Sequence, residues 1–291
     1  HKYASPGDIV LPSVFMPPLY AYFINVIKLF FNNIFDLVKL VIFIQIFLSL
    51  ISIYIFFKIV RNFENIKLSL ILTSIFSIFP LYVYSSVQIS SICIQIFLLL
   101  SFFYFLIQYL EKKGTINIFL FSFFSGLLIL TRGEFFLFYF LTLVYFFQYI
   151  KIDYRSFILS IIITLLVISP YLKRNYNYFE KIVLTKSFGF NLLKGNNPEF
   201  LVEGSDSFID TNFNQKTLKI VTDNNYEIKL DNYYKDQAFT IIKADPLEYF
   251  KLYLLKVFSF IFLDLNSSYP GYYNILNILP KIIFAITTLA G

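Results

Sequence analysis

Three cationic side chains stand directly after long apolar runs, where a positive charge is costly unless it has a partner. Arg132 follows the run that ends in LILT, and Lys173 and Arg174 follow the run that ends in ISPYL. A guanidinium group donates hydrogen bonds in a planar fork that matches a phosphate group. The chemistry that these residues predict is therefore the binding of an anion at the ends of two apolar helices.

Two simpler roles compete with anion binding. Arg132 and Glu134 flank Gly133, so their opposite charges can pair with each other across a short turn. Lys173 and Arg174 can anchor a helix end by extending their charged groups into the lipid headgroup region. The sequence leaves both alternatives open.

The other reactive side chains predict little chemistry. Cys93 lies in an apolar run, which is typical of a small buried hydrophobe, and the single histidine is His1. We therefore expect no intrachain disulfide and no metal site. Asp36 is interpreted as a charge at a helix N-terminus. Five further acids are interpreted as solvated loop residues: Asp8, Glu199, Glu203, Asp206 and Asp210.

The composition requires a membrane environment. Hydrophobic residues make up 58% of the 291 residues and charged residues only 14%, whereas soluble domains carry about 25% charged residues. Such a chain cannot cover a soluble surface, so we predict an all-α polytopic membrane protein. Tyrosine must supply the aromatic side chains at the membrane interface, because the chain has no Trp.

Six apolar runs have about the length that a helix needs to cross hydrocarbon. They are residues 36–60, 67–84, 88–109, 116–131, 134–150 and 154–172, and a seventh run starts at 272 and continues to 291. The cations of the connecting loops are concentrated in the first, third and fifth loops, which the positive-inside rule makes cytoplasmic.

Residues 1–35, the turn at Arg132 and the segment 173–271 then lie on the extracytoplasmic side of the plasma (inner) membrane. Loops longer than about 60 residues escape the positive-inside rule, so topology permits Lys173 and Arg174 there without explaining them. All three cations lie on one side, and we expect them to converge on a lipid phosphate at the headgroup level.

Two apolar segments are expected to lie on the membrane. Residues 17–31 begin with two prolines and show helical apolar spacing over too short a length to span. Residues 246–264 follow the same design, although a spanning helix is the alternative there. Between them, a mostly polar loop contains KTLKIVTDNNYEIKL, whose alternation predicts a β-hairpin over residues 216–230.

Several short motifs occur in an order that resembles a known family. They are MPPLYAYF, FPLYVYSS, LTRGE, SPYLKRNYNYF, TKSFGFNLLKGNNPEF and DPLEYFKLYLLKVFSFIF. Together they resemble the GT-C superfamily of integral-membrane glycosyltransferases over nearly the whole chain, in the bacterial branch similar to protein O-mannosyltransferases and the lipid A aminoarabinose transferase. The resemblance implies a GT-C-like helical bundle with interfacial helices.

The resemblance implies transfer of a sugar from a polyprenyl-phosphate-linked donor to a lipid, glycan or protein acceptor on the extracytoplasmic face. Arg132, Lys173 and Arg174 would bind the donor phosphate and stabilise its developing charge. The family's catalytic acid is expected upstream of His1, with Glu134 as a candidate substitute. The substrate pocket is expected to be lined by Tyr20, Tyr84, Gln88, Asn175, Tyr176 and Asn196.

One departure weakens the family pattern, because relatives carry a Glu where SSVQISS offers only Gln88 and serines. No cofactor beyond the donor and no nucleic-acid partner is expected, and dependence on a divalent metal is left open. Two other function classes stay open as well. One is a lipid-linked polysaccharide polymerase or ligase. The other is a transporter or flippase of lipid-linked sugars, which predicts inverted repeats and helices broken within the membrane; we see neither in the sequence.

Overall fold

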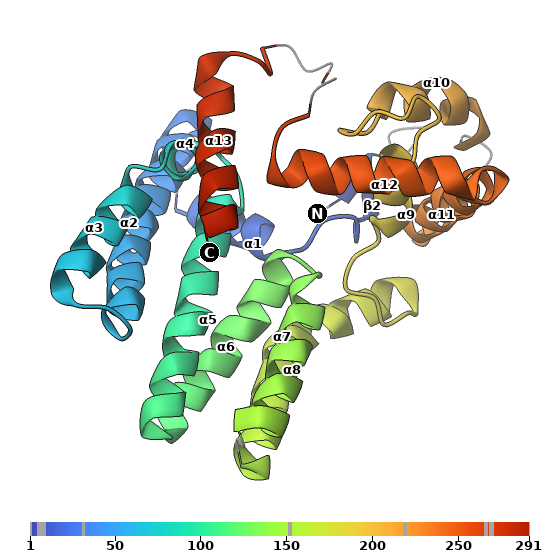
Figure 1. Cartoon of the computed structure of the whole chain (residues 1–291). Coiled ribbons are helices and arrows are strands. Elements are labelled where there is room, and N and C mark those ends of the chain that lie inside the picture. The colour runs from blue at the N-terminus through green and yellow to red at the C-terminus, as the bar shows by residue number, and fades with distance from the viewer. Residues whose placement is uncertain are drawn as a thin grey trace. The chain divides into compact units, whose positions relative to one another are not determined.

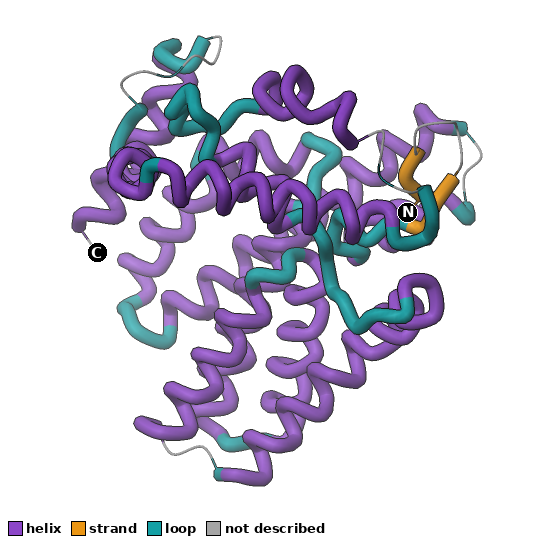
Figure 2. The backbone as a smooth tube through the Cα atoms, turned by 90° about the vertical axis from the view of Figure 1, so that its right-hand side faces the viewer, coloured by secondary structure: helices purple, strands orange, loops and turns teal. Residues whose placement is uncertain are grey.

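The computed structural model describes residues 2–4, 10–30, 33–150, 153–217, 220, 222–264, 267 and 271–290. The chain divides into two compact units. Pro17–Leu184 forms one, here called the central unit, and His1–Met16 with Thr185–Gly291 forms the other, here called the terminal unit. Helices dominate both units (Figure 1), and two short strands, orange in Figure 2, belong to the terminal unit.

The helices of the central unit correspond to the apolar runs of the sequence. Three are long and apolar enough to cross a membrane: α2 (Ile34–Arg61), α5 (Ile92–Lys112) and α8 (Tyr154–Phe179). A bent pair, α3 (Ile66–Ser77) and α4 (Pro80–Val87), is a fourth candidate if both form one span. These lengths and compositions support a multi-pass membrane protein, while the six separate spans stay a prediction.

The other helices of this unit are shorter. They are α1 (Leu19–Lys28), α6 (Thr115–Thr131) and α7 (Phe135–Tyr145), which continues as a π-helical turn over Phe146–Ile150. Asp36 lies in the first turn of α2, as predicted. The helices α5, α6, α7 and α8 run together in Figure 1, with α6 in contact with the other three.

The segment predicted as one span over 67–84 is broken. α3 and α4 meet at an angle of 54°, and Pro80 is the first residue of α4. Proline has no N–H to donate and its ring clashes with the preceding turn, so it kinks or breaks a helix. The expectation of one continuous helix over 67–84 is therefore wrong.

Small and polar residues join α6 to α8. The hydroxyl oxygens of Ser122 and Ser160 are 2.7 Å apart, and the Tyr139 hydroxyl of α7 lies 2.7 Å from Ser160. A Cβ added at Gly126 would lie 2.6 Å from the Cβ of Val167, so only glycine permits this approach of the two helices. Close contact through small residues and interhelical hydrogen bonds is the usual way in which membrane helices associate.

The helix α8 extends beyond the predicted end of its apolar run at 172. It passes through Pro170 and ends at Phe179. Pro170 cannot donate to the carbonyl of Leu166, but the Ser169 hydroxyl donates to that oxygen at 3.0 Å. This substitution for the missing backbone bond explains why the helix tolerates the proline.

The terminal unit contains five helices and one strand pair among its described residues. The helices are α9 (Phe188–Gly195), α10 (Asp206–Thr217), α11 (Tyr226–Ala244), α12 (Pro246–Ile261) and α13 (Ile275–Ala290). The strands β1 (Lys2–Ala4) and β2 (Val10–Pro12) pair antiparallel. The described chain is thus helical apart from one short ladder.

The β-hairpin predicted over 216–230 is wrong. Its described start belongs to α10, and its second arm is the first turn of α11. The buried positions Glu227, Asp231, Tyr234 and Ala238 of α11 recur at helical spacing. This longer periodicity outweighs the short alternation that suggested a strand.

The helix α12 is amphipathic. Tyr249 and Leu252 are buried within the unit, while Leu247, Phe250 and Leu254 are exposed at 64%, 57% and 51%. An exposed apolar face at a spacing of three to four residues is typical of a helix that lies on a membrane. Its placement there, like that of α1, stays a prediction.

Candidate functional site

The contacts between α6 and α8 place two of the predicted cations at the same end of the helix pair. Ser122 contacts Ser160, and Gly126 contacts Val167, so position numbers rise together and the two helices are parallel. Arg132 is six residues beyond Gly126, and Lys173 is six residues beyond Val167. At about 1.5 Å of rise per residue, both cations stand at the same end of this helix pair.

The turn between α6 and α7 exposes its two charges. Arg132 is the C-cap of α6 with an extended backbone, φ −151°, and Glu134 is the N-cap of α7. Both side chains are exposed, and no hydrogen bond or ion pair between described residues includes either of them. The alternative in which Arg132 pairs with Glu134 is not the arrangement found here.

Arg174 differs from its neighbour Lys173, which is exposed and has no polar contact with the described residues. The Arg174 guanidinium donates to Asn175 Oδ1 at 2.7 Å and lies against the rings of Tyr171, Tyr178 and Phe179, at 5.0–5.9 Å from their centroids. Arg174 is therefore held by its own helix.

Asn175 connects this cation to the chain beyond α8. Its side chain is fully buried, and its Nδ2 donates to the carbonyl oxygen of Val183 at 2.7 Å. Because the same amide accepts from Arg174, the arginine fixes the orientation in which Asn175 reaches Val183. Asn175 thus stabilises the turn that follows α8. Its direct role in the substrate pocket stays a prediction.

The cationic end of the helix pair is surrounded by apolar and aromatic side chains. Leu130, Tyr171 and Leu172 belong to one hydrophobic cluster with Leu19 of α1 and Phe135 of α7. The ring of Tyr171 also contacts Tyr22 of α1 edge-on, at 6.5 Å between centroids. Cations beside such surroundings suit an anion that carries an apolar group better than a free anion.

Tyr20 takes part in a buried polar network. Its hydroxyl donates to Oε1 of Gln45 at 2.8 Å, and Nε2 of Gln45 reaches the carbonyl oxygens of Ser86 and Gln88 at 3.3 and 2.6 Å. Burial, together with the nearby Cys93, raises the pKa of Tyr20 to about 12. The network joins α1, α2 and the end of α4.

Sequence reasoning missed Gln45, although a glutamine inside a long apolar run is a usable signal. Gln45 is 0% exposed. Its backbone carbonyl also accepts from Sγ of Cys93 at 3.0 Å, and Cys93 lies 3.2 Å from the Ser49 hydroxyl. Cys93 is buried as predicted, but hydrogen-bonded rather than purely apolar in its contacts.

Tyr84 and Gln88 line an apolar groove of about 810 Å³ between the bent pair α3–α4 and α5. Both side chains are exposed, Tyr84 at 61%. At the same groove, the Ser90 hydroxyl is buried without a hydrogen-bond partner. None of the three predicted cations lines this groove.

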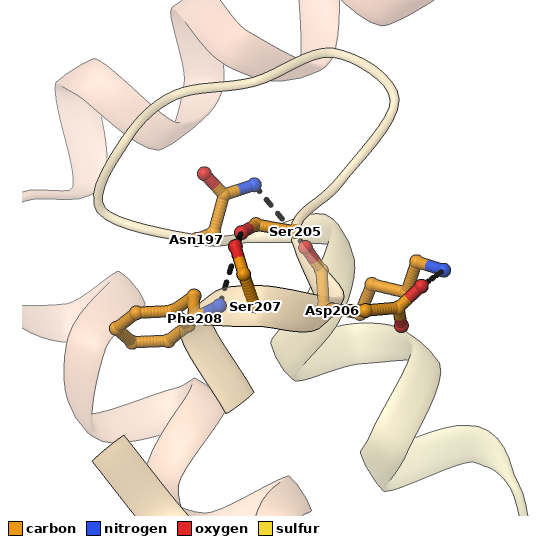
Figure 3. Close-up of polar contacts among 6 residues, drawn as sticks. Asn197, Ser205, Asp206, Ser207 and Phe208 are labelled. Carbon is orange, nitrogen blue, oxygen red and sulfur yellow. Dashed lines mark hydrogen bonds and ion pairs between the residues drawn. The ribbon is translucent and has the colours of Figure 1, made fainter. Parts of the chain in front are cut away.

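Tyr176 of α8 is exposed at 57%, and Asn196 belongs to the terminal unit. The Asn196 amide donates to the Leu192 carbonyl oxygen at 2.8 Å, which closes the end of α9. The fully buried neighbour Asn197 organises the following loop (Figure 3), because it donates to the Lys194 and Leu201 carbonyls and accepts from the Leu201 N–H.

The predicted loop acids have varied surroundings. Asp206 pairs with Lys194 at 2.6 Å at the start of α10, where the Ser205 hydroxyl accepts from the Phe208 N–H (Figure 3). Glu199 and Asp210 are exposed, while Glu203 is half-buried. Asp8 lies outside the described residues.

Sequence reasoning did not single out two acids on α11 that are buried in the terminal unit. Glu227 and Asp231 are each 5% exposed and stand one turn apart on α11. Their spacing of four residues was the available signal, since it places both on one helix face. Within the described residues, no three His, Cys, Asp or Glu side chains are grouped so that they could hold a metal ion.

Comparison of the chain with protein-family models, with curated proteins and with solved structures gives no match. The class that the structure defines is a helical, multi-pass membrane protein. The finer family resemblance rests on the sequence motifs alone.

Proposed function

We propose that this chain is part of a membrane glycosyltransferase that moves a sugar from a polyprenyl-phosphate-linked donor to an acceptor on the extracytoplasmic face. The observation that carries the proposal is that Arg132 and Lys173 follow the same end of the parallel helices α6 and α8. Two exposed cations beside an apolar cluster have the chemistry that a lipid-linked phosphate requires.

In the proposed reaction, an acceptor nucleophile attacks the anomeric carbon, and the bond from that carbon to the phosphate oxygen breaks. The leaving group is the lipid phosphate, which gains negative charge as the bond lengthens. Arg132 and Lys173 stabilise this charge by direct contact, because both side chains are exposed and make no polar contact with described residues. The proton of the acceptor requires a base, and Glu134 is the candidate within this chain.

Arg174 takes a different part in this proposal from the one that its sequence position suggested. Its guanidinium already contacts Asn175 and three aromatic rings. We assign it to positioning the end of α8, so that Lys173 is presented at the correct height. This revised role makes Arg132 and Lys173 the first residues to test.

The test is transfer from a labelled polyprenyl-phosphate sugar by the full-length protein in membranes. Arg132→Ala and Lys173→Ala are each expected to lower the transfer rate by about a hundredfold, as removal of one charge-stabilising donor does in other enzymes. Arg155→Ala is the matched control, because Arg155 is an exposed arginine in the first turn of α8, at its opposite end. Transfer that is undiminished in both variants would contradict the site.

A second candidate is a transporter or flippase of lipid-linked sugars, and the broken pair α3–α4 favours it. Transporters often use discontinuous helices beside their substrate path. Here the break at Pro80 adjoins the apolar groove that Tyr84 and Gln88 line. A substrate path along this groove would give Arg132 and Lys173 no role, because both cations lie outside the groove. We therefore rank the glycosyltransferase first.

The two candidates differ in a measurable way. A flippase moves an intact fluorescent lipid-linked sugar between the leaflets of a proteoliposome without breaking its phosphate bond. A glycosyltransferase releases polyprenyl phosphate and glycosylates an acceptor. Movement of the intact lipid that depends on Gln88 and Tyr84, with no release of the sugar, would replace the first proposal by the second.

A further inference from the structure

The terminal unit contains a cavity of about 270 Å³, between residues that follow β2 and the helices α9 and α11. This volume lies just below the usual range for ligand pockets, about 300–1,000 Å³, so it suits a small molecule. The cavity belongs entirely to the terminal unit, and an inference about it does not rest on the proposed glycosyl transfer.

Two groups of opposite charge line this cavity without contacting each other. Asp231 is 5% exposed, and its Oδ1 accepts from the N–H groups of Gly189 and Phe190 at 2.6 and 3.2 Å. Its Oδ2 takes part in no hydrogen bond or ion pair among the described residues, nor does Nζ of Lys186. Both residues line the same cavity.

Opposite charges that line one small cavity would normally pair, because a buried charge without a partner is costly. No described nitrogen and oxygen of Lys186 and Asp231 lie within the 4.0 Å of an ion pair. The backbone of Lys186 is held by its N–H, which donates to the Val14 carbonyl at 2.9 Å, and one oxygen of Asp231 is held by the start of α9.

Aromatic side chains form the remaining wall. The rings of Phe15 and Phe190 meet edge to face at 5.7 Å, and those of Phe190 and Tyr234 at 5.8 Å. Rings beside a carboxylate are the usual surroundings of an organic ammonium group, which is attracted to the face of each ring.

The neighbouring acid Glu227 supports the cavity rather than offering a further open group. Its Oε1 accepts from the Ser13 hydroxyl at 2.8 Å and its Oε2 from the Val14 N–H at 2.6 Å. Glu227 therefore fixes the segment that carries Phe15 against α11. Among the charged side chains that line the cavity, those with a group that has no polar partner among the described residues are Lys186 and Asp231.

We propose that this cavity binds a small zwitterion, with its ammonium group between the aromatic rings and Asp231 and its anionic group at Lys186. A carboxylate and a phosphate both satisfy the anionic requirement, so a free amino acid and a phosphoethanolamine group share this chemistry. Each end of such a ligand satisfies one of the two open charges.

The test is calorimetric titration of the full-length protein in detergent with phosphoethanolamine, glycine, ethanolamine and inorganic phosphate. Phosphoethanolamine or glycine is expected to bind at least about tenfold more tightly than ethanolamine or phosphate, because only a zwitterion contacts both charges. The better of the two zwitterions identifies the anionic group. Equal binding of all four probes, or no binding of either zwitterion, would overturn the proposal.

Variants separate a binding role from a structural one. Lys186→Gln and Asp231→Asn are each expected to weaken binding by about tenfold or more. Asparagine keeps the oxygen that accepts from α9, and the Lys186 side chain makes no polar contact with the described residues, so both variants are expected to fold. The matched controls Lys243→Gln and Asp236→Asn alter exposed charges of α11 and should bind like the parent protein. Unchanged binding in both cavity variants would also contradict the assignment.

Discussion

The two units place their charged side chains in opposite ways. At the end of α6 and α8 in the central unit, Arg132 and Lys173 are exposed and have no polar partner among the described residues. In the terminal unit, Glu227 and Asp231 are buried, and each accepts two hydrogen bonds. The first arrangement leaves charge available to a ligand. In the second, both oxygens of Glu227 and one oxygen of Asp231 hold segments of the chain together, which leaves only Oδ2 of Asp231 open to a ligand.

This difference predicts how stability and function should separate. Removing an exposed charge alters what the protein binds and leaves its folding almost unchanged. Removing a buried carboxylate leaves its former donors unsatisfied inside the protein, which costs free energy of folding. The most informative variants are those that compare the two kinds of charge at matched positions.

The largest effect on stability is expected for Glu227→Ala. The change removes both acceptors of the Ser13 hydroxyl and the Val14 N–H, so the free energy of unfolding should fall by about 3 kcal/mol. Thermal and denaturant unfolding in detergent would measure it, with the exposed Asp236→Ala of the same helix as control. If Glu227→Ala and Asp236→Ala were equally stable, buried and exposed charges would contribute alike to folding, and the difference drawn between the two units would fail.

If burial decides how much a polar side chain contributes to the free energy of unfolding, a buried polar residue of the central unit should also be important for stability. Gln45→Leu in the central unit leaves the Tyr20 hydroxyl without its acceptor, and two carbonyl groups without a donor, so a loss of about 2 kcal/mol is expected. The exposed Gln148→Leu should change the same unfolding measurement by less than about 0.5 kcal/mol. A harmless Gln45→Leu would show that this network adds little.

The sequence predicted most helices but not their interruptions. Apolar periodicity located α1, α2, α5, α6 and α12 within a few residues, and α8 at its start but not at its end, because burial and lipid exposure both select apolar residues along a helix. The break at Pro80 and the passage through Pro170 could not be told apart in advance. In the structure, the residue before Pro80 has an extended backbone, whereas the Ser169 hydroxyl before Pro170 donates to the Leu166 carbonyl within the helix.

The candidate site shows the same limit. Charge and position were sufficient to single out Arg132, Lys173 and Arg174, and the contacts of the parallel helices α6 and α8 then placed the first two at the same end. The sequence could not show that Arg174 is occupied by Asn175 and three rings, since these contacts depend on side-chain rotamers. Nor could it show that Asp231 reaches the start of α9, forty-two positions away.

The third prediction compares the two arginines directly. Arg174→Ala loses a charge-assisted hydrogen bond and its ring contacts, so the free energy of unfolding should fall by about 1.5 kcal/mol. Arg132→Ala should change it by less than about 0.5 kcal/mol, while transfer activity falls in both. If Arg132→Ala proved the more destabilising variant, Arg132 would have a structural partner and the exposed site would lose its main residue.

The smallest effect concerns an exposed acid that is nevertheless structural, Asp153, the N-cap of α8. A hydrogen bond from the Ser156 backbone N–H, assisted by the Tyr109 hydroxyl, lowers the pKa of the Asp153 carboxyl. A lowered pKa in the folded state stabilises folding above the unfolded pKa of about 3.9, and this contribution disappears as the pH falls through the lower folded value. Asp153→Asn keeps the capping oxygen but loses the charge, so it should be less stable by only about 0.5 kcal/mol at pH 7.

That small difference should shrink toward zero as unfolding is measured at successively lower pH, from pH 5 down to about pH 2.5. Asp36→Asn, which alters another exposed acid in a first helical turn, is the control for general effects of charge at low pH. A difference that stays constant over this range would mean that the loss of stability in Asp153→Asn does not come from the charge of Asp153. In that case an exposed charge would add nothing to the stability of this protein, and exposure alone would identify the charges that are available to ligands.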